Sequence, residues 1–159
     1  GCVVDKVLIA YTSKGGAAKK IAETIAEVLQ DKFNFWVDTV NLTEQSVPYF
    51  GEYSGIIIGT GVRNGEIYPE TDFFLSKDFG NRPIAYYTCS GFTVPKTYEE
   101  IVTAYITNVL ARHPKVKPFT TEAFRGYTKV LGLTVNRKLD IARIEAWANE
   151  IGEKFSKIQ

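Results

Sequence analysis

A run of three isoleucines between two glycines, GIIIG at residues 55–59, constrains the fold more than any other feature of the sequence. Isoleucine is β-branched and favours strands, and an apolar run without alternation is typical of a strand that is buried on both faces. Such strands occur in parallel sheets that helices cover on both sides. We therefore expect residues 55–59 to form a central strand of an α/β domain.

The rest of the chain alternates between the hydrophobic periods of strands and helices. Further strands are predicted over residues 6–11, 33–42 and 83–88 and within residues 116–124. Helices are predicted after the first strand, from Pro69 to near residue 79, from Thr97 to residues 112–114, and from near Asp140 onward. Strands that alternate with helices form parallel sheets with right-handed crossovers. We expect one three-layer α/β/α domain over residues 1–159 with a five-stranded parallel sheet.

The helices have predicted buried and exposed faces. In the first helix the apolar face is Ile21, Ile25, Val28 and Leu29, and the polar face is Lys20, Glu23, Thr24 and Glu27. Thr97 and Glu100 match a capping box, and their helix is expected to bury Ile101, Val102, Tyr105, Ile106, Val109 and Leu110. The last helix is expected to bury Ile144, Trp147, Ile151 and Phe155.

Several single residues have predicted structural roles. Trp36 and Trp147 fall at core-facing positions, and His113 lies at a helix end, where it is expected to interact with the dipole of its own helix. Aromatic residues beside a sheet usually pack in the core, which is the favoured prediction for Tyr98. The run of residues 127–135 gives no assignment.

The composition excludes several functional classes. The chain has 19 lysines and arginines against 18 acidic residues, and they are scattered, which argues against nucleic acid or an anionic membrane as the main partner. A single histidine leaves no second imidazole for a zinc site or a catalytic triad. No apolar stretch approaches the roughly 20 residues of a transmembrane helix. The two cysteines, Cys2 and Cys89, favour a reducing compartment, and we expect a cytoplasmic location.

Ligands of open parallel sheets bind at the carboxyl ends of the strands. The segments there are Thr12–Ala18, Thr60–Gly65 and Cys89–Lys96, and they are rich in hydrogen-bond donors that suit an anion and a flat polar ring. In the first segment, glycines allow successive N–H groups to point at one place at the start of a helix, as in phosphate sites. The alternative is that Gly15 and Gly16 only form a tight turn that Ser13 caps.

Three stretches of the sequence, VLIAYTSKGGAAKKIA, GTGVRNGEIYP and EAFRGY before a final helix with a tryptophan, resemble the flavodoxin-like family. Within it the chain looks most like the flavodoxin-domain branch that includes menaquinone-dependent protoporphyrinogen oxidase. The resemblance covers nearly the full length. It implies the strand order 2-1-3-4-5 and FMN as the cofactor.

The resemblance also implies which positions would bind FMN. The ribityl phosphate would lie on Thr12, Ser13, Lys14, Gly15, Gly16, Ala17 and Ala18. The isoalloxazine would lie between two sets, Thr60, Gly61, Val62, Arg63, Asn64 and Gly65 on one side and Thr88, Cys89, Ser90, Gly91 and Phe92 on the other. Flavodoxins usually have threonine and asparagine where this chain has Ala17 and Ala18, so we expect weaker FMN binding. The oxidase branch tends to have a histidine at the position of Tyr68.

Two functions remain open from the sequence. The first is an FMN-binding redox protein that passes electrons or hydride to a partner protein or a quinone-like acceptor. In it Arg63 would lie over the pyrimidine edge of the flavin, the alternative being a solvated loop arginine, and Cys89 is expected to be a small buried filler. The second is a flavin-free interaction scaffold, which Ala17 and Ala18 favour. A phosphate receiver of the same topology is excluded, because it needs acidic residues where this chain has Tyr11-Thr12 and Gly59-Thr60.

Overall fold

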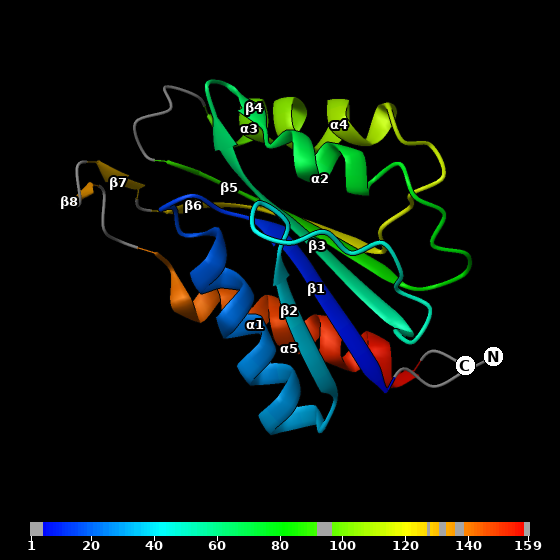
Figure 1. Cartoon of the computed structure of the whole chain (residues 1–159). Coiled ribbons are helices and arrows are strands. Elements are labelled where there is room, and N and C mark those ends of the chain that lie inside the picture. Colours follow the sequence, from blue (N-terminus) through cyan, green and yellow to red (C-terminus); the bar gives the residue numbers. More distant parts are fainter. Residues whose placement is uncertain (1–4, 92–96, 127, 131–132, 136–138, 158–159) are drawn as a thin grey trace.

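The computed structural model describes residues 5–91, 97–126, 128–130, 133–135 and 139–157. Its main sheet has the order β2-β1-β3-β5-β6, and these five strands run parallel (Figure 1). The strands are β1 (Lys6–Thr12), β2 (Trp36–Asn41), β3 (Gly55–Arg63), β5 (Ile84–Gly91) and β6 (Thr120–Gly126). A short strand, β4 (Glu66–Ile67), pairs antiparallel with the end of β3. Among the parallel strands this is the order 2-1-3-4-5, so the predicted fold class is confirmed.

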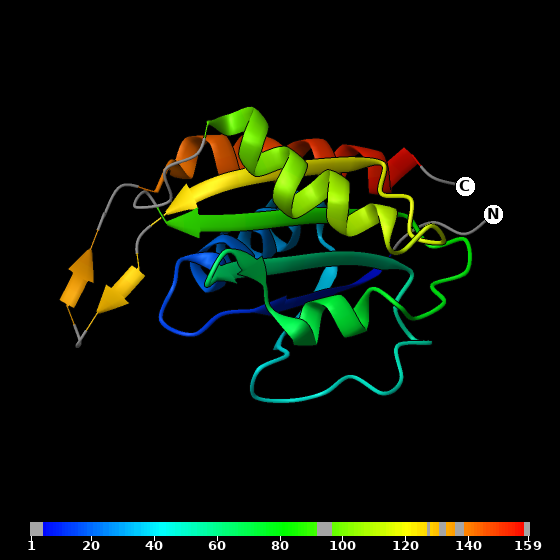
Figure 2. The same cartoon turned by 90° about the horizontal axis from the view of Figure 1, so that it is seen from above.

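Helices cover both faces of the sheet, which makes three layers (Figures 1 and 2). One face carries α1 (Ala18–Phe33) and α5 (Ile141–Lys157). The other carries α2 (Pro69–Phe74) and a continuous helical segment of α3 (Tyr98–Val102), η1 (Thr103–Thr107) and α4 (Asn108–Ala111). No helix in the described part of the chain is both long enough and apolar enough to cross a membrane.

The core consists of two clusters, one on each face of the sheet. Along β3, Ile57 faces α1 and α5, whereas Ile56 and Ile58 face α2 and α4, and all three are fully buried. Burying an isoleucine side chain contributes roughly 1.5–3 kcal/mol. The GIIIG run is therefore the doubly covered central strand that its composition predicts.

Tyr87 links the central strand to the start of α1. Its ring lies directly over Gly59, where an added Cβ would come within 2.1 Å of the Tyr87 Cζ atom. Its hydroxyl donates to the Ala18 carbonyl at 2.9 Å. A fully buried side chain of β5 thus fixes the first turn of α1 relative to the sheet.

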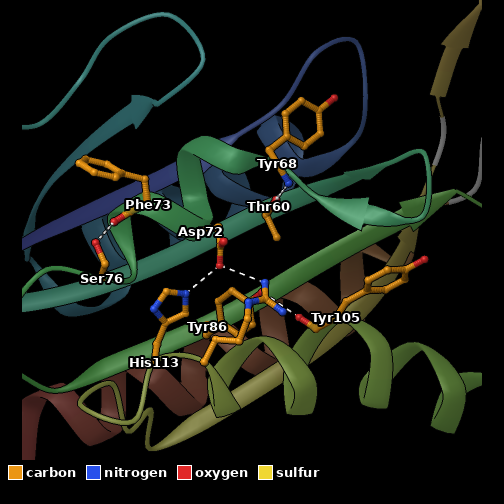
Figure 3. Close-up of polar contacts among 9 residues, drawn as sticks. Thr60, Tyr68, Asp72, Phe73, Ser76, Tyr86, Tyr105 and His113 are labelled. Carbon is orange, nitrogen blue, oxygen red and sulfur yellow. Dashed lines mark hydrogen bonds and ion pairs between the residues drawn. The ribbon is translucent and has the colours of Figure 1, made fainter.

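Some elements differ from their prediction. The helix that starts at Pro69 ends at Phe74 instead of near residue 79, because the Ser76 hydroxyl bonds to the Phe73 carbonyl at 2.5 Å and the chain then turns (Figure 3). Thr24, predicted on the polar face of α1, is buried and donates to the Lys20 carbonyl at 2.8 Å. The unassigned segment forms a separate antiparallel hairpin of β7 (Thr128–Val130) and β8 (Leu133–Val135).

Two aromatic residues predicted in the core lie at the surface. Trp36 is 66% exposed, because β2 is an edge strand whose alternation buries Phe35 and Val37 instead. Tyr98 is 53% exposed, and its hydroxyl donates to the Glu122 carboxylate at 2.7 Å. Trp147 is buried as predicted, and its indole N–H donates to Thr120.

The predicted helix from Thr97 contains a π-helical turn. Its capping box is confirmed, since the Glu100 amide donates to the Thr97 hydroxyl at 3.2 Å and the Thr97 amide donates to the Glu100 carboxylate at 3.0 Å. The widened turn, η1, includes Tyr105, whose main-chain carbonyl accepts a hydrogen bond from the Tyr86 hydroxyl at 2.8 Å (Figure 3). A side chain that donates a hydrogen bond to a main-chain carbonyl of a helix is a recognised cause of local helix distortion. Val102 and Leu110, predicted to be buried, are only partly so.

His113, which follows the end of α4 as predicted, also pairs with another element. Its Nε2 atom lies 2.7 Å from the Asp72 carboxylate, to which Arg112 also donates, at 3.0 Å (Figure 3). Burial raises the pKa of Asp72, but the hydrogen bonds from His113 and Arg112 outweigh it and hold the pKa below its ordinary value. This ion-pair cluster joins α2 to the end of α4.

Candidate functional site

The carboxyl ends of β1, β3 and β5 form one continuous edge of the sheet. The register aligns Thr12, Thr60 and Thr88 in a row across the three strands, and all three are fully buried. The first two of the three predicted segments begin in this row, and the third begins one residue beyond it. The structure therefore brings together the segments that the sequence assigned to one site.

Beneath this edge lies a hydrogen-bonded network of three threonines, Thr12, Thr60 and Thr71. The Thr12 hydroxyl donates to that of Thr60 at 2.9 Å and lies 3.0 Å from that of Thr71, which also donates to the Gly59 carbonyl. The Thr60 hydroxyl donates to the Gly61 carbonyl at 2.6 Å. The side chains of Thr12 and Thr60 are thus part of the scaffold beneath the site. Sequence reasoning missed Thr71, because its partner lies far away in the chain.

The first loop, between Thr12 and Ala18, presents its main chain at the start of α1. Gly15 has a φ of 74°, a left-handed conformation that favours glycine. The predicted cap is wrong: the Ser13 hydroxyl donates to the Gly16 carbonyl at 3.1 Å, and the N-cap is Ala17, whose methyl group cannot accept from the first-turn amides. These amides carry the positive end of the helix dipole.

Ala17 and Ala18 pack in the core. Both are almost fully buried in the cluster under α1 and α5. The fit is tight, since a Cβ added at Gly126 would lie 2.6 Å from the Cβ of Ala17 and 3.0 Å from the Cys89 sulfur. Only their main-chain N–H groups remain as donors.

Asn41 anchors the first loop from the end of β2. Its side-chain amide donates to the Ser13 carbonyl at 3.1 Å, and its side-chain carbonyl accepts from the Ser13 amide at 3.4 Å. Sequence reasoning did not single out this residue, although it ends the strand next to β1. On this side the loop borders a polar hollow of about 580 Å³, whose lining includes Lys14, Lys19 and Lys20.

The second segment is a strand end and a hairpin, which corrects its prediction as a loop. β3 extends to Arg63 and pairs with β4 through the Val62–Ile67 and Arg63–Glu66 contacts. Asn64 and Gly65, with φ of 54° and 76°, form the connecting turn, as expected for an Asn-Gly pair. Arg63 is exposed near this turn.

In the third segment, Thr88–Gly91 belong to β5, whereas Phe92 lies outside the described residues. Cys89 is buried, and burial raises the pKa of its thiol to about 12, so the prediction of a small filler is confirmed. The hydroxyls of Thr88 and Ser90 are buried without a hydrogen-bond partner among the described residues.

The three segments meet at a small cavity, here called the crevice. Its volume is about 30 Å³, and it is lined by Ser13, Lys14, Gly16, Ala17, Gly61, Val62, Tyr68, Cys89, Ser90 and Gly91. All of these except Tyr68 were predicted site residues. Tyr68 is buried, and Figure 3 shows its ring extending from the start of α2 toward the loop after β1.

Two neighbouring groups partly offset the effect of burial on the pKa of Tyr68. Burial raises its pKa above the ordinary value, while the nearby Arg63 guanidinium and a hydrogen bond with the Lys14 backbone lower it in part. The described residues contain no group of three or more histidine, cysteine or acidic side chains that could hold a metal ion. The site is thus a turn at the start of α1 beside a small crevice.

Comparison with known proteins agrees with this geometry. The family described as flavodoxin domain matches residues 8–154. No curated protein sequence matches the chain.

Solved structures share the fold at low identity. Flavodoxin 1 from Bacillus cereus is 15% identical with a TM-score of 0.65, over 98% of this chain and 99% of that one. Fusobacterium nucleatum flavodoxin, in a structure with flavin mononucleotide bound, is 14% identical with a TM-score of 0.60, over 94% and 98% of the two chains. Rubredoxin oxygen:oxidoreductase from Desulfovibrio gigas is 16% identical with a TM-score of 0.65, over 94% of this chain and only 36% of that one. By its family match and its architecture, the chain belongs to the flavodoxin domain family.

Proposed function

We propose that the chain binds FMN at the carboxyl ends of β1, β3 and β5 and transfers electrons or hydride to a redox partner. The observation that carries the proposal is the first loop, which lies at the start of a 16-residue helix beside the crevice. The Fusobacterium flavodoxin, which shares the fold, has flavin mononucleotide bound.

The phosphate would be held by main-chain groups. The amides of Lys14, Gly15, Gly16, Ala17 and Ala18 are the proposed donors, with the Lys14 ammonium as a compensating charge. The side chains of Thr12 and Ser13 are not the main donors in this proposal, because both hydroxyls already donate within the protein. This donor set fits a phosphate group.

The ring would lie between the second and third segments. The proposed residues are Thr60, Gly61, Val62, Arg63, Asn64 and Gly65 on one side and Thr88, Cys89, Ser90, Gly91 and Phe92 on the other. Main-chain groups of Gly61 and Gly91 border the crevice, and Arg63 would stabilise negative charge on the reduced ring. When bound, FMN would supply the redox chemistry, and the protein would supply orientation and hydrogen bonds.

The redox partner, the family branch and the cellular location are proposed from the net charge and from the sequence resemblance. We propose a dedicated protein partner or a quinone-like acceptor, since a net charge of +1 does not favour the strong electrostatic steering of a general carrier. The branch with menaquinone-dependent protoporphyrinogen oxidase is the proposed relative, on the order and spacing of the three matching stretches. A single domain over residues 1–159 in the cytoplasm completes the proposal.

Titration of the apoprotein with FMN and with riboflavin tests this function. Because the proposed grip is on the phosphate, FMN should quench on binding and riboflavin should bind at least about tenfold more weakly. FMN at 100 times its Kd should also raise the free energy of unfolding by about 2.7 kcal/mol. Equal affinity for the two flavins, or no binding of either, would contradict the proposal.

A matched pair of glycine variants controls for the fold. Gly15→Ala should lower FMN affinity by about tenfold, because a side chain strains the left-handed turn that aims the amides. Gly80→Ala introduces the same strain at a φ of 63° in the segment after α2 and should leave FMN affinity unchanged.

A flavin-free scaffold is the second candidate. The crevice favours it, since about 30 Å³ is far below the roughly 300–1,000 Å³ of small-molecule sites. A protein that shows no thermal shift with FMN would fit this candidate.

A further inference from the structure

We propose that a hollow between α2 and the loop before β3, here called the apolar hollow, binds a small molecule with an apolar body and one carboxylate group. Its volume is about 500 Å³, and it is lined by Leu42, Ser46, Val47, Pro48, Pro69, Glu70, Phe73, Phe74 and Lys77. Among the described residues it has no lining residue in common with the crevice. This site therefore goes beyond the proposed FMN site.

The size and lining of the apolar hollow are those of a small-molecule site. Such sites have volumes of about 300–1,000 Å³ and apolar walls with a few polar groups that orient the ligand. The crevice, at about 30 Å³, is far smaller than this range. In the lining of the apolar hollow, only Ser46, Glu70 and Lys77 are polar among the described residues. The hollow thus has room for a ligand whose body is apolar.

The walls of the apolar hollow are fixed by the fold. Leu42, Val47 and Phe74 are buried in the core cluster on the α2 face of the sheet. The end of the loop that carries Val47 is held by Arg82, whose guanidinium donates to the Tyr53 carbonyl at 2.6 Å. Binding to such a pre-formed site costs less free energy, because little of the chain has to be ordered.

Phe73 adds apolar surface that the described part of the chain leaves uncovered. Its side chain is 70% exposed, whereas its neighbour Phe74 is buried. Figure 3 shows the Phe73 ring extending from α2 away from Asp72 and His113. A ligand that covers this ring removes apolar surface from water, which favours binding.

Lys77 determines the charge of the ligand. Its ammonium lies 5.3 Å from the centroid of the Phe73 ring, and it has no acidic partner within the described part of the chain. Glu70, the other charged residue of the lining, lies in the first turn of α2, where the free N–H groups of the helix favour a negative charge. The unmatched charge is therefore positive. A carboxylate complements it with charge-assisted hydrogen bonds, which are about twice as strong as neutral ones.

Calorimetric titration of the full chain with decanoate, 1-decanol and decylamine tests the site. Decanoate should bind at least about tenfold more tightly than the other two ligands, because only the carboxylate pairs with Lys77. Each methylene added between octanoate and decanoate should lower the Kd about fourfold. Equal affinity for decanoate and decanol, tighter binding of decylamine, or no binding of decanoate would overturn the proposal.

Three variants locate the binding. Lys77→Gln should raise the Kd for decanoate by about tenfold and leave the Kd for decanol unchanged. Phe73→Ala should weaken the binding of both ligands, because it removes apolar wall. Lys154→Gln is the matched control and should change neither, since its ammonium also lies over a phenylalanine ring, 5.9 Å from the Phe119 centroid, but on α5.

The variants also separate this site from the FMN site. Unchanged decanoate affinity in Lys77→Gln, or an equal loss in Lys154→Gln, would overturn the proposal. The outcome does not depend on FMN, because decanoate is added to the protein alone. Failure of the wild type to bind FMN would overturn the proposed function and leave the apolar hollow standing.

Discussion

The two halves of one sheet edge differ in whether their buried hydroxyls are hydrogen-bonded. At the ends of β1 and β3, Thr12, Thr60 and Thr71 bond to one another and to main-chain carbonyls. At the end of β5, Thr88 and Ser90 are as deeply buried, yet their hydroxyls have no partner among the described residues. A satisfied network rigidifies its surroundings, whereas an unsatisfied group costs free energy. The comparison indicates a pre-built half and a half whose polar groups remain available.

The largest expected effect comes from breaking the built half. Thr12→Val keeps the shape but removes two hydrogen-bonding contacts, so it should lower the free energy of unfolding by about 2 kcal/mol in urea titrations. Thr88→Val is the matched control in the same row of the sheet. It should stay within about 0.5 kcal/mol of wild type or stabilise the protein, because no bond is lost. An equal loss of unfolding free energy in the two variants would contradict the difference between the two halves.

A tyrosine pair repeats the comparison under the π-helical turn. Tyr86→Phe removes the bond to the Tyr105 carbonyl and should cost about 1 kcal/mol. Tyr105→Phe removes a buried hydroxyl that has no partner among the described residues and should be nearly neutral. Thermal unfolding of the two variants checks this, and a larger loss in Tyr105→Phe would contradict it.

The smallest effect concerns the ion-pair cluster that joins α2 to the end of α4. The pKa of Asp72 is lowered in the folded protein, so its contribution to stability is present above the ordinary aspartate pKa and is lost as the pH falls below about 4. Because the carboxylate is partly exposed, Asp72→Asn should cost only about 0.5–1 kcal/mol at pH 7. The difference from wild type should shrink as the pH falls below about 4. Asp31→Asn, on the exposed face of α1, is the control and should leave the free energy of unfolding at pH 7 within about 0.5 kcal/mol of wild type.

The layers and the site edge could be predicted from the sequence because both depend on local patterns. The isoleucine run requires cover on both faces, and carboxyl ends of parallel strands always meet at one edge. It was harder to predict which individual side chains are buried and which are exposed. Trp36 lies outside because β2 is an edge strand, which alternation alone does not reveal, and Tyr98 bonds with Glu122 on a distant strand.

The details of the site depend on contacts that no local pattern encodes. Thr12 and Ser13 have hydroxyls of the kind that bind phosphate. In the structure, however, these hydroxyls donate to Thr60 and to the Gly16 carbonyl. Tyr68 follows the predicted second segment closely in sequence, yet its position in the crevice arises only when α2 docks beside β1. The residue types were enough to locate the candidate site. Which atoms border the site depends on the three-dimensional packing.

The contact between Gly59 and Tyr87 has a consequence for the evolution of this protein. No other residue fits at position 59 while the ring of Tyr87 lies over it. A shorter residue at position 87 would leave the Ala18 carbonyl without its hydrogen bond from the Tyr87 hydroxyl. Either change alone is therefore damaging, and a lineage can cross that barrier only by altering both positions together. Among descendants of this chain, the two sites should covary.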